Sequence, residues 1–272
     1  MSGYEVSGLW RYPVKSMAGE RLETVTLTAS GIDGDRRWAV RDLETGKVAS
    51  AKRPRPYGAL LHWSARLDED GAVEVRSPDG ATCRAGDPSL DEALSEALGR
   101  PVAMAPVEEG RDEAYDSEWP DIPGTSLSNV ELELPVAMMT GKSSFVDLAA
   151  IHLVLESSMA HLAERSGAEV GVERFRPNVL LAGGSPDGFA DLDWREVDAT
   201  VGETRLRVAD AAPRCVMTTL DNGAQGPARE VLATLAVEAR KDFDLGTYAC
   251  FGTYAEVERG GTVTVGDRFT LE

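Results

Sequence analysis

Short strand-like stretches, rather than helices, dominate this chain and limit the folds open to it. Helical periodicity is confined to residues 90–98, 157–166 and 228–241. Because the strands do not alternate regularly with helices, the pattern does not favour a doubly wound parallel sheet. We expect a mostly β fold with a few helices (α+β) that is built on β-barrel-like sheets. Alternating apolar and polar residues predict strands over 5–12, 22–28, 37–41, 60–67, 72–76, 151–155, 179–182, 195–200, 204–208, 216–220, 254–257 and 262–271.

A long acidic segment interrupts this pattern near the middle of the chain. Residues 106–126 contain Pro106, Pro120 and Pro123 together with many carboxylates. Prolines and charges at this density are typical of loops, and long loops often separate domains. We therefore predict a loop over 106–126 and two domains, residues 1–125 and 126–272.

The charge of the chain is strongly negative but unevenly distributed. With 46 acidic residues, 28 lysines and arginines and a net charge of −18, nucleic acid and anionic membranes are poor partners. The first fifth of the chain is nevertheless rich in cations, and a second, sparser set lies beyond residue 173. Folding either brings these sets into one pocket for a phosphate or leaves them as separate solvated charges, and the sequence alone favours the second reading. The two sets are Arg11, Lys15, Arg36, Arg37, Lys52, Arg53 and Arg55, and Arg174, Arg176 and Arg214.

The cysteines and the apolar segments indicate in which cellular compartment the protein is expected. Cys83, Cys215 and Cys250 form no Cys-x-x-Cys pair, and an odd number leaves one unpaired in any disulfide scheme. The first residues do not read as a signal peptide, and no apolar run approaches the length of a membrane-spanning helix. We expect a cytoplasmic protein with reduced thiols.

One thiol stands beside a cation. Cys215 follows Arg214 directly, and a thiolate next to a guanidinium attacks electrophiles and binds soft metals. The alternative is a small apolar side chain on a strand. In the segment Phe175-Arg176-Pro177-Asn178, an extended backbone would place Arg176 and Asn178 on one side, where they could hold a phosphate or a heterocycle edge. From the spacing alone, a structural salt bridge and a turn asparagine explain these two residues better.

Other candidates have weaker local signals. Lys15 and Ser16 offer an ammonium and a hydroxyl just after a predicted strand, which suits a terminal phosphate. His62, His152 and His161 lack the spacing of metal ligands, so a zinc site is not predicted.

Taken in order, these segments resemble MOSC-domain proteins with an N-terminal MOSC β-barrel domain, and in particular the bacterial relatives of the mitochondrial amidoxime-reducing component. The resemblance implies that residues 1–125 form the N-terminal β-barrel domain and residues 126–272 the MOSC domain. The stretches that carry it are WRYPVKSMAGE (10–20), GIDGDRRWAV (31–40), HLVLESSMAHL (152–162), RFRPNVLLAG (174–183), FADLDW (189–194), PRCVMTTLD (213–221), FGTYAEV (251–257) and GTVTVGDRFTL (261–271).

The resemblance also implies a molybdenum cofactor, in which a pyranopterin dithiolene holds the metal and one protein cysteine is a further ligand. Cys215 occupies the position of that metal ligand and of the catalytic residue. A soft thiolate suits a metal already bound by sulfur, and cations suit the phosphate of the cofactor. The residues that match cofactor-binding positions are Lys15, Ser16, Arg36, His152, Ser158, Arg176, Asn178, Arg214 and Cys215.

The reaction implied by the resemblance is two-electron reduction of N–O bonds in N-hydroxylated small molecules. The sequence shows no cysteine-rich ferredoxin cluster, so we expect electrons from a separate flavoprotein or iron–sulfur protein. The turn 222–226 lacks the Asp-Pro-x-Thr-Gly form that the resemblance leads us to expect. Two other roles stay open: a sulfur-transfer module, in which Cys215 carries a persulfide, and a non-catalytic carrier of the cofactor.

Overall fold

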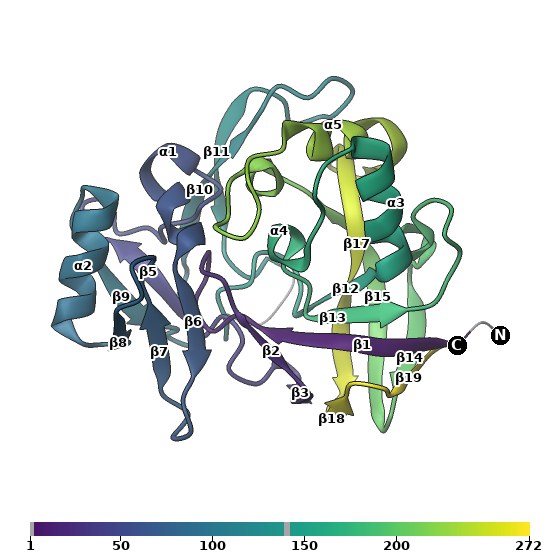
Figure 1. Cartoon of the computed structure of the whole chain (residues 1–272), viewed down its shortest axis with the longest axis horizontal. Helices are drawn as coiled ribbons and strands as arrows, with labels where there is room; N and C mark the ends of the chain where they lie inside the picture. Colours follow the sequence, from purple (N-terminus) through teal and green to yellow (C-terminus); the bar gives the residue numbers. More distant parts are fainter. Residues whose placement is uncertain (1–2, 139–141) are drawn as a thin grey trace.

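The computed structural model describes residues 3–138 and 142–272, and its largest element is a closed barrel of seven strands. Strands β12 and β17 pair across the gap that would otherwise leave the sheet open (Figure 1). Neighbours run antiparallel except for β12 and β13, which are parallel. The predicted β-barrel-like, mostly β class is thus confirmed. In barrel order the strands are β12 (Ile151–Leu155), β13 (Val179–Ala182), β1 (Tyr4–Arg11), β19 (Arg268–Leu271), β14 (Val197–Val201), β15 (Thr204–Pro213) and β17 (Gly246–Arg259).

Strand β12 shows how the barrel is stabilised. All five of its residues are buried, because one face points into the barrel and the other lies under helices. Ile151, Leu153 and Leu155 join the core inside the barrel, whereas Val154 belongs to the apolar layer outside it. Each fully buried aliphatic side chain contributes about 1.5–3 kcal/mol relative to exposure. His152 is the polar exception on this strand, and it faces the pocket described below.

Helices cover the outside of the barrel on one side. Helices α3 (Glu156–Ser166) and α5 (Arg229–Glu238) pack there, and the short helix α4 (Val172–Phe175) lies nearby. The helices predicted over 157–166 and 228–241 are confirmed with small changes at their ends. The remaining elements on this part are η2 (Ala190–Asp193), η3 (Val216–Thr219), β16 (Arg240–Phe243) and β18 (Gly261–Thr264). Within the described residues, no helix is both long and apolar enough to span a membrane.

The strand predicted over 216–220 is wrong, because these residues form the 3₁₀ helix η3. The hydroxyl of Thr218 donates to the carbonyl of Cys215 at 3.0 Å, and that of Thr219 donates to the carbonyl of Val216 at 2.8 Å. Hydroxyls that bond to carbonyls three residues back compete with a strand ladder and favour a turn. Cys215 therefore precedes a helical turn instead of starting a strand.

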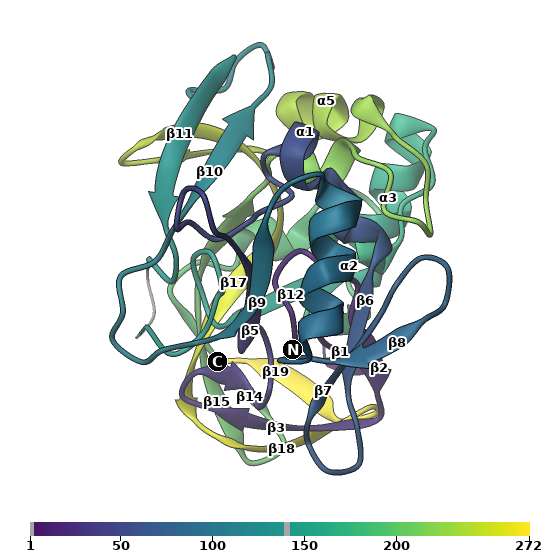
Figure 2. The same ribbon diagram turned by 90° about the vertical axis from the view of Figure 1, so that its left-hand side faces the viewer.

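The N-terminal part consists of small sheets around its own core. Strands β5 and β9 pair, β6, β7 and β8 form a three-stranded sheet, and β3 and β4 join β18 (Figure 2). Helix α2 is capped by Asp87 and ends before Gly99, which is in the left-handed conformation, so the helix predicted over 90–98 is confirmed. The elements are β2 (Glu20–Leu22), β3 (Thr24–Thr28), β4 (Gly31–Ile32), β5 (Trp38–Asp42), α1 (Pro54–Tyr57), η1 (Gly58–His62), β6 (Ser64–Leu67), β7 (Val73–Arg76), β8 (Thr82–Arg84), α2 (Pro88–Leu98) and β9 (Val102–Pro106).

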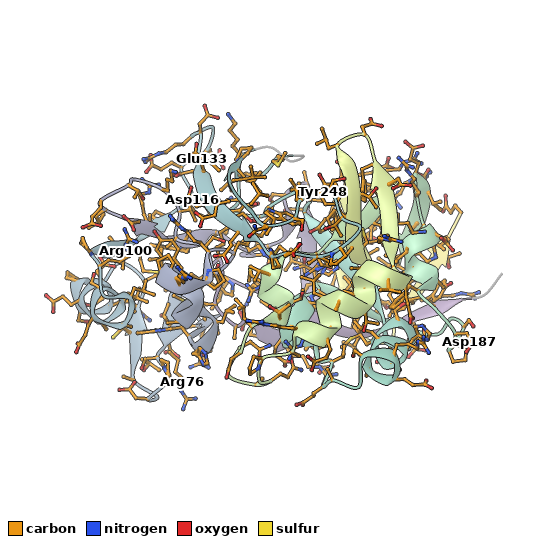
Figure 3. All side chains as sticks on the ribbon, turned by 90° about the horizontal axis from the view of Figure 1, so that it is seen from above. Arg76, Arg100, Asp116, Glu133, Asp187 and Tyr248 are labelled. Carbon is orange, nitrogen blue, oxygen red and sulfur yellow. The ribbon has the colours of Figure 1, made fainter. Side chains whose placement is uncertain are left out.

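The loop predicted over 106–126 is wrong in part. Residues Ala114–Trp119 form β10, which pairs with β11 (Val130–Pro135) as an antiparallel hairpin. Alternate side chains of β10 are buried, and Asp116, on the other face, pairs with Lys47 and Arg53. Asp116 and Glu133 both bind Lys47, and Figure 3 shows the two carboxylates on this hairpin. The high acidity of the segment hid its strand alternation.

The two predicted domains share a sheet. β1, from the start of the chain, lies between β13 and β19 in the barrel, and β3 pairs with β18. The division into residues 1–125 and 126–272 stays a prediction.

Candidate functional site

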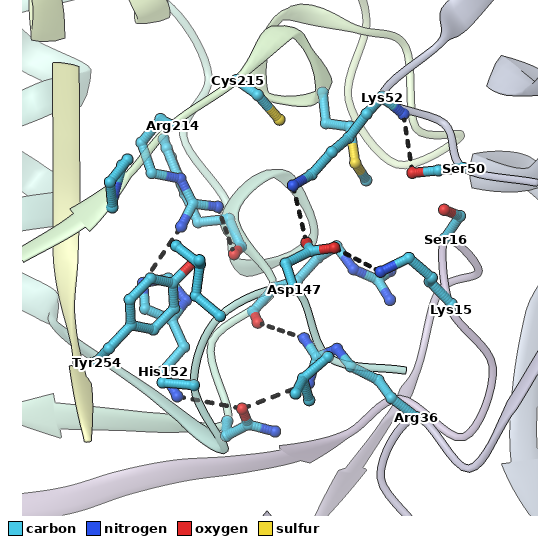
Figure 4. Close-up of a pocket in the computed structure, with 18 of the residues that line it drawn as sticks. Lys15, Ser16, Arg36, Ser50, Lys52, Asp147, His152, Arg214, Cys215 and Tyr254 are labelled. Atoms are coloured by element: carbon cyan, nitrogen blue, oxygen red, sulfur yellow. Dashed lines mark hydrogen bonds and ion pairs between the residues drawn. The ribbon is translucent and has the colours of Figure 1, made fainter. Parts of the chain in front are cut away.

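A polar pocket, partly open to solvent, lies between the barrel and the N-terminal part (Figure 4). It brings Lys15, Arg36 and Lys52 of the first set together with Arg174, Arg176 and Arg214, so the reading of separate solvated charges is wrong for these six residues. Arg11 and Arg53 lie outside the pocket and pair with other carboxylates. Among the described residues, the charged lining of the pocket comprises the cations Lys15, Arg36, Lys52, Arg174, Arg176 and Arg214 and one carboxylate, that of Asp147. Of the residues predicted for the site, Lys15, Ser16, Arg36, His152, Arg176, Asn178, Arg214 and Cys215 line it, and Ser158 does not.

Two arginines share one aromatic ring on the side of the pocket away from Cys215. The guanidinium carbons of Arg36 and Arg176 lie 4.8 and 4.4 Å from the centre of the Tyr12 ring. Asp35 accepts a hydrogen bond from the Tyr12 amide at 2.7 Å and also pairs with Arg36. The amide oxygen of Asn178 lies 3.4 Å from Arg36. Stacked guanidiniums held in this way are suited to a planar or phosphate-like anion.

Three lining residues adopt left-handed backbone conformations. The φ angles are 67° at Ser16, 48° at Arg36 and 56° at Arg176, and only three other non-glycine residues in the described chain have positive φ. Such conformations cost about 1–2 kcal/mol for residues with a Cβ. Strain of this kind gathers where a site needs particular side-chain directions.

The extended backbone predicted through 175–178 is wrong at Arg176. This residue ends α4 in the left-handed conformation, because its amide donates to the carbonyl of Val172. Arg176 and Asn178 still reach the same pocket, by a turn instead of by strand alternation. Asn178 is anchored from both ends: its Oδ1 accepts from the amide of His152 at 3.2 Å, and its Nδ2 donates to the carbonyl of Trp10 at 3.3 Å.

The arginines of the pocket are not fully satisfied by the protein. Nη2 of Arg176 and Nε of Arg214 are buried and have no hydrogen-bond partner among the described residues. Burial and the neighbouring charge of Arg36 lower the pKa of Arg176 to about 10. Buried, unpaired donors beside a like charge are costly unless an anion binds them. The donor set therefore fits a multiply charged anionic group.

Cys215 lies at the opposite side of the pocket, partly exposed and not in a disulfide. Nη2 of Arg214 donates to the carbonyl of Phe175 at 3.0 Å, and its Nη1 lies 3.5 Å from Nε2 of His152. Burial and the positive charge of Arg214 hold the pKa of His152 well below its usual range, so the imidazole is neutral. Gly252 makes room for this ring: at its φ of 71°, a Cβ would lie 2.5 Å from Nε2 of His152.

Two lysines share the carboxylate of Asp147. Nζ of Lys15 lies 2.5 Å from Oδ1, and Nζ of Lys52 lies 3.0 Å from Oδ2. Lys15 also donates to the carbonyl of Phe145 at 2.8 Å, and Lys52 to the hydroxyl of Tyr115 at 3.0 Å. Asp147 and Tyr115 were not predicted from the sequence, since neither stands in a motif.

The three groups titrate differently. Burial lowers the pKa of Lys15 to about 8, although Asp147 opposes the shift. Burial acts in the same direction on Lys52, but Asp147 and Tyr115 outweigh it and raise the pKa of Lys52 well above its usual value. The pKa of Asp147 falls far below its usual range, because the two lysines outweigh the effect of burial. Lys52 and Asp147 are charged at neutral pH, and Lys15 loses its proton first as the pH rises.

Ser158, predicted at the site, has a structural role. It is fully buried and donates to Oδ1 of Asp191 at 2.5 Å. Oδ2 of Asp191 accepts from the amide of Leu155 at 3.1 Å, so this carboxylate binds the start of α3. Arg174 is also largely structural, although it lines the pocket: it donates to the carbonyls of Thr218, Leu220 and Gly226.

A metal at Cys215 would need ligands from outside the protein. The described residues hold no group of three or more His, Cys, Asp or Glu side chains that could bind a metal ion. One soft thiolate beside several anion-binding groups therefore fits a metal that arrives with sulfur ligands and a phosphate.

Comparisons with known proteins agree with this architecture. Residues 140–270 match the MOSC domain, and residues 3–99 match the MOSC N-terminal beta barrel domain. The chain is 34% identical to the mitochondrial amidoxime-reducing component 1 of Xenopus laevis over 291 residues, covering 96% of this chain and 80% of that protein. It is 26% identical to the human component 1 over 286 residues, with 96% and 81% covered. A molybdenum cofactor sulfurase of Oryza sativa subsp. japonica is 25% identical over 299 residues, which cover 95% of this chain and 33% of that protein.

Proposed function

This chain belongs to the family of MOSC-domain proteins that includes the mitochondrial amidoxime-reducing components, and on that premise we propose that it is a molybdenum-cofactor-dependent oxidoreductase that reduces N–O bonds. Its substrates are N-hydroxylated small molecules. The observation that carries the proposal is the pocket, which gathers one accessible thiol and cations from both ends of an acidic chain.

We propose that the two ends of the pocket bind different parts of the cofactor. Cys215 would be the protein ligand of the metal. Arg176 would bind the phosphate through its Nη2, which has no partner among the described residues, with the guanidinium of Arg36 beside it, and Asn178 would orient the pterin next to them. Ser16 and Lys15 would contact the same group from the N-terminal part. Arg214 and neutral His152 would line the space nearest the thiolate.

The residues of the pocket then act on substrate by position and charge. The bound molybdenum cofactor supplies the two-electron redox chemistry of N–O cleavage. The reaction consumes two electrons and two protons, and converts R–NH–OH to R–NH₂ and water. Cations around Cys215 stabilise negative charge that develops on the departing oxygen. We propose that a separate flavoprotein or iron–sulfur protein supplies the electrons.

Metal analysis tests the proposal. Protein expressed in a host that makes the cofactor should contain about one molybdenum atom per chain and should reduce an amidoxime with a chemical reductant. Cys215→Ser should lose both, because it removes the metal ligand. Cys83→Ser is the matched control and should retain both, since Cys83 lies outside the pocket. Reductase activity in protein free of molybdenum would refute the proposal.

The match to a molybdenum cofactor sulfurase supports a second candidate. In that role Cys215 would carry a persulfide and transfer sulfur to the cofactor. The cations flanking Cys215 would stabilise such an anion equally well. A persulfide on Cys215 found by mass spectrometry, together with no reduction of any N-hydroxylated substrate, would favour this role over the reductase.

A further inference from the structure

Lys52 is a cation of the pocket that lies close to Cys215 and to which the proposed function gives no role. It belongs to none of the sequence motifs described above. Figure 4 shows its ammonium extending to the middle of the pocket, between Cys215 and Asp147. Its side chain is only 12% exposed. A lysine that is buried at this point places a fixed positive charge on the side of the pocket where the proposed metal ligand lies.

Two of the three N–H groups of the Lys52 ammonium have hydrogen-bond acceptors among the described residues. It donates to Oδ2 of Asp147 at 3.0 Å and to the hydroxyl of Tyr115 at 3.0 Å, and it lies 4.9 Å from the centre of the Tyr115 ring. An ammonium has three N–H donors. Among the described residues, no third acceptor is found for this one. The third donor is therefore available to a molecule in the pocket.

The charge balance around Lys52 is positive. Asp147 is the one carboxylate among the described residues of the pocket, and its two oxygens are already taken by Lys15 and Lys52. One negative charge between two ammonium groups leaves a net positive charge. On the other side of Cys215 lies Arg214, whose Nε has no hydrogen-bond partner in the part of the chain that the structure describes. A cationic substrate would meet like charge from both sides, whereas a negative oxygen would be stabilised from both.

We infer that Lys52 is a substrate-binding residue that selects N–O substrates with a negatively charged or readily ionised oxygen, hydroxamic acids above all, over amidoximes, whose N–OH group is a much weaker acid. This inference rests on the proposed function and names its substrate class. The spare N–H of Lys52 binds the oxygen of the N–O bond, and Tyr115 and Asp147 hold the ammonium in place.

The reaction on this substrate class is balanced. The N–O bond of R–CO–NH–OH breaks, two electrons come from the electron-donor protein proposed above, and two protons from solvent complete the products R–CO–NH₂ and water. Lys52 keeps its own proton and stabilises the negative charge on the oxygen as it leaves nitrogen.

Steady-state kinetics test the inference in the molybdenum-loaded protein. Benzohydroxamic acid and benzamidoxime share a ring and differ in the group beside the N–O bond. Lys52→Met should lower kcat/KM for benzohydroxamic acid about 100-fold, and for benzamidoxime much less. Lys52→Arg should restore most of the preference. Lys47→Met, which removes a lysine paired outside the pocket, is the matched control and should change neither value.

A binding measurement gives a second readout that needs no turnover. Benzoate and benzamidinium have similar shapes, opposite charges and no N–O bond. The purified protein should bind benzoate in preference to benzamidinium by calorimetry, and Lys52→Met should weaken benzoate about tenfold. Equal losses for both substrates, or unchanged benzoate affinity in Lys52→Met, would overturn the inference. A wild-type protein that reduces no substrate but keeps the benzoate preference would refute the proposed function and leave Lys52 as an anion-binding residue.

Discussion

The pocket holds two pairs of cations in different ways: Arg36 and Arg176, called the arginine side below, and Lys15 and Lys52, called the lysine side. On the arginine side, Arg36 and Arg176 stack on Tyr12, and both stand at left-handed backbone positions. On the lysine side, Lys15 and Lys52 share Asp147 and have ordinary backbone conformations. The arginine side thus relies on strained backbone and on guanidiniums that stay charged, whereas the lysine side depends on one carboxylate and responds to pH. The first provides permanent charge, and the second provides charge that can be adjusted.

The largest expected effect comes from removing the carboxylate of the lysine side. Asp147→Asn leaves two buried ammonium groups next to each other without a negative partner, which should lower the free energy of unfolding by about 3 kcal/mol in urea titrations. Asp116→Asn is the matched control: Asp116 pairs with Lys47 and Arg53 at the surface and should cost about 1 kcal/mol or less. Similar losses in the two variants would show that the lysines do not depend on Asp147.

A pair of substitutions at one position separates strain from charge on the arginine side. Arg176→Met and Arg176→Gly both remove the guanidinium, so both should lower the molybdenum content about tenfold or more. Only glycine relieves the left-handed backbone, so Arg176→Gly should unfold with a free energy about 1 kcal/mol higher than Arg176→Met.

Urea titrations of the two variants without cofactor measure this difference. Gly167→Ala supplies a calibration, since Gly167 ends α3 at a φ of 67° with open space around it, and alanine there should cost a similar amount. Equal stability of the two Arg176 variants would mean that the backbone at this position is not strained.

The sequence predicted the features that depend on local patterns and missed those that depend on contacts between distant segments. Strands β12 and β13 and helix α3 were predicted closely, because each has a regular apolar pattern or a glycine stop. Cys215, Arg176 and Lys15 were found because they stand in motifs. What was missed depends on contacts between distant segments: Asp147 has no local signal, and Lys52 gains its meaning only from Asp147 and Tyr115.

The wrong predictions have local physical causes. Thr218 and Thr219 favour strands by composition, yet their hydroxyls close a 3₁₀ turn after Cys215. Acidic residues hid the strand β10, because cations from other segments neutralise its exposed face. Ser158 matched a motif but binds Asp191 at the base of α3. The cytoplasmic location stays a prediction.

The smallest expected effect is a pH dependence confined to the lysine side. The folded-state pKa of Lys15 is lowered to about 8 by burial, so above that pH the unfolded chain holds a proton that the folded chain has lost. The free energy of unfolding therefore rises with pH through this interval, by about 1 kcal/mol per pH unit, until Lys15 titrates in the unfolded chain as well. Arg176, with a pKa of about 10, does not titrate between pH 8 and 9.

Comparison with Lys15→Met isolates this contribution. Burial raises the pKa of Cys250 to about 12, which lowers stability as the pH rises, but it does so equally in both proteins. The difference in unfolding free energy, wild type minus Lys15→Met, should thus increase by about 1 kcal/mol from pH 8 to pH 9 in urea titrations. A constant difference would mean that Lys15 keeps its proton over this interval, and the lysine side would then hold its charge as permanently as the arginine side does.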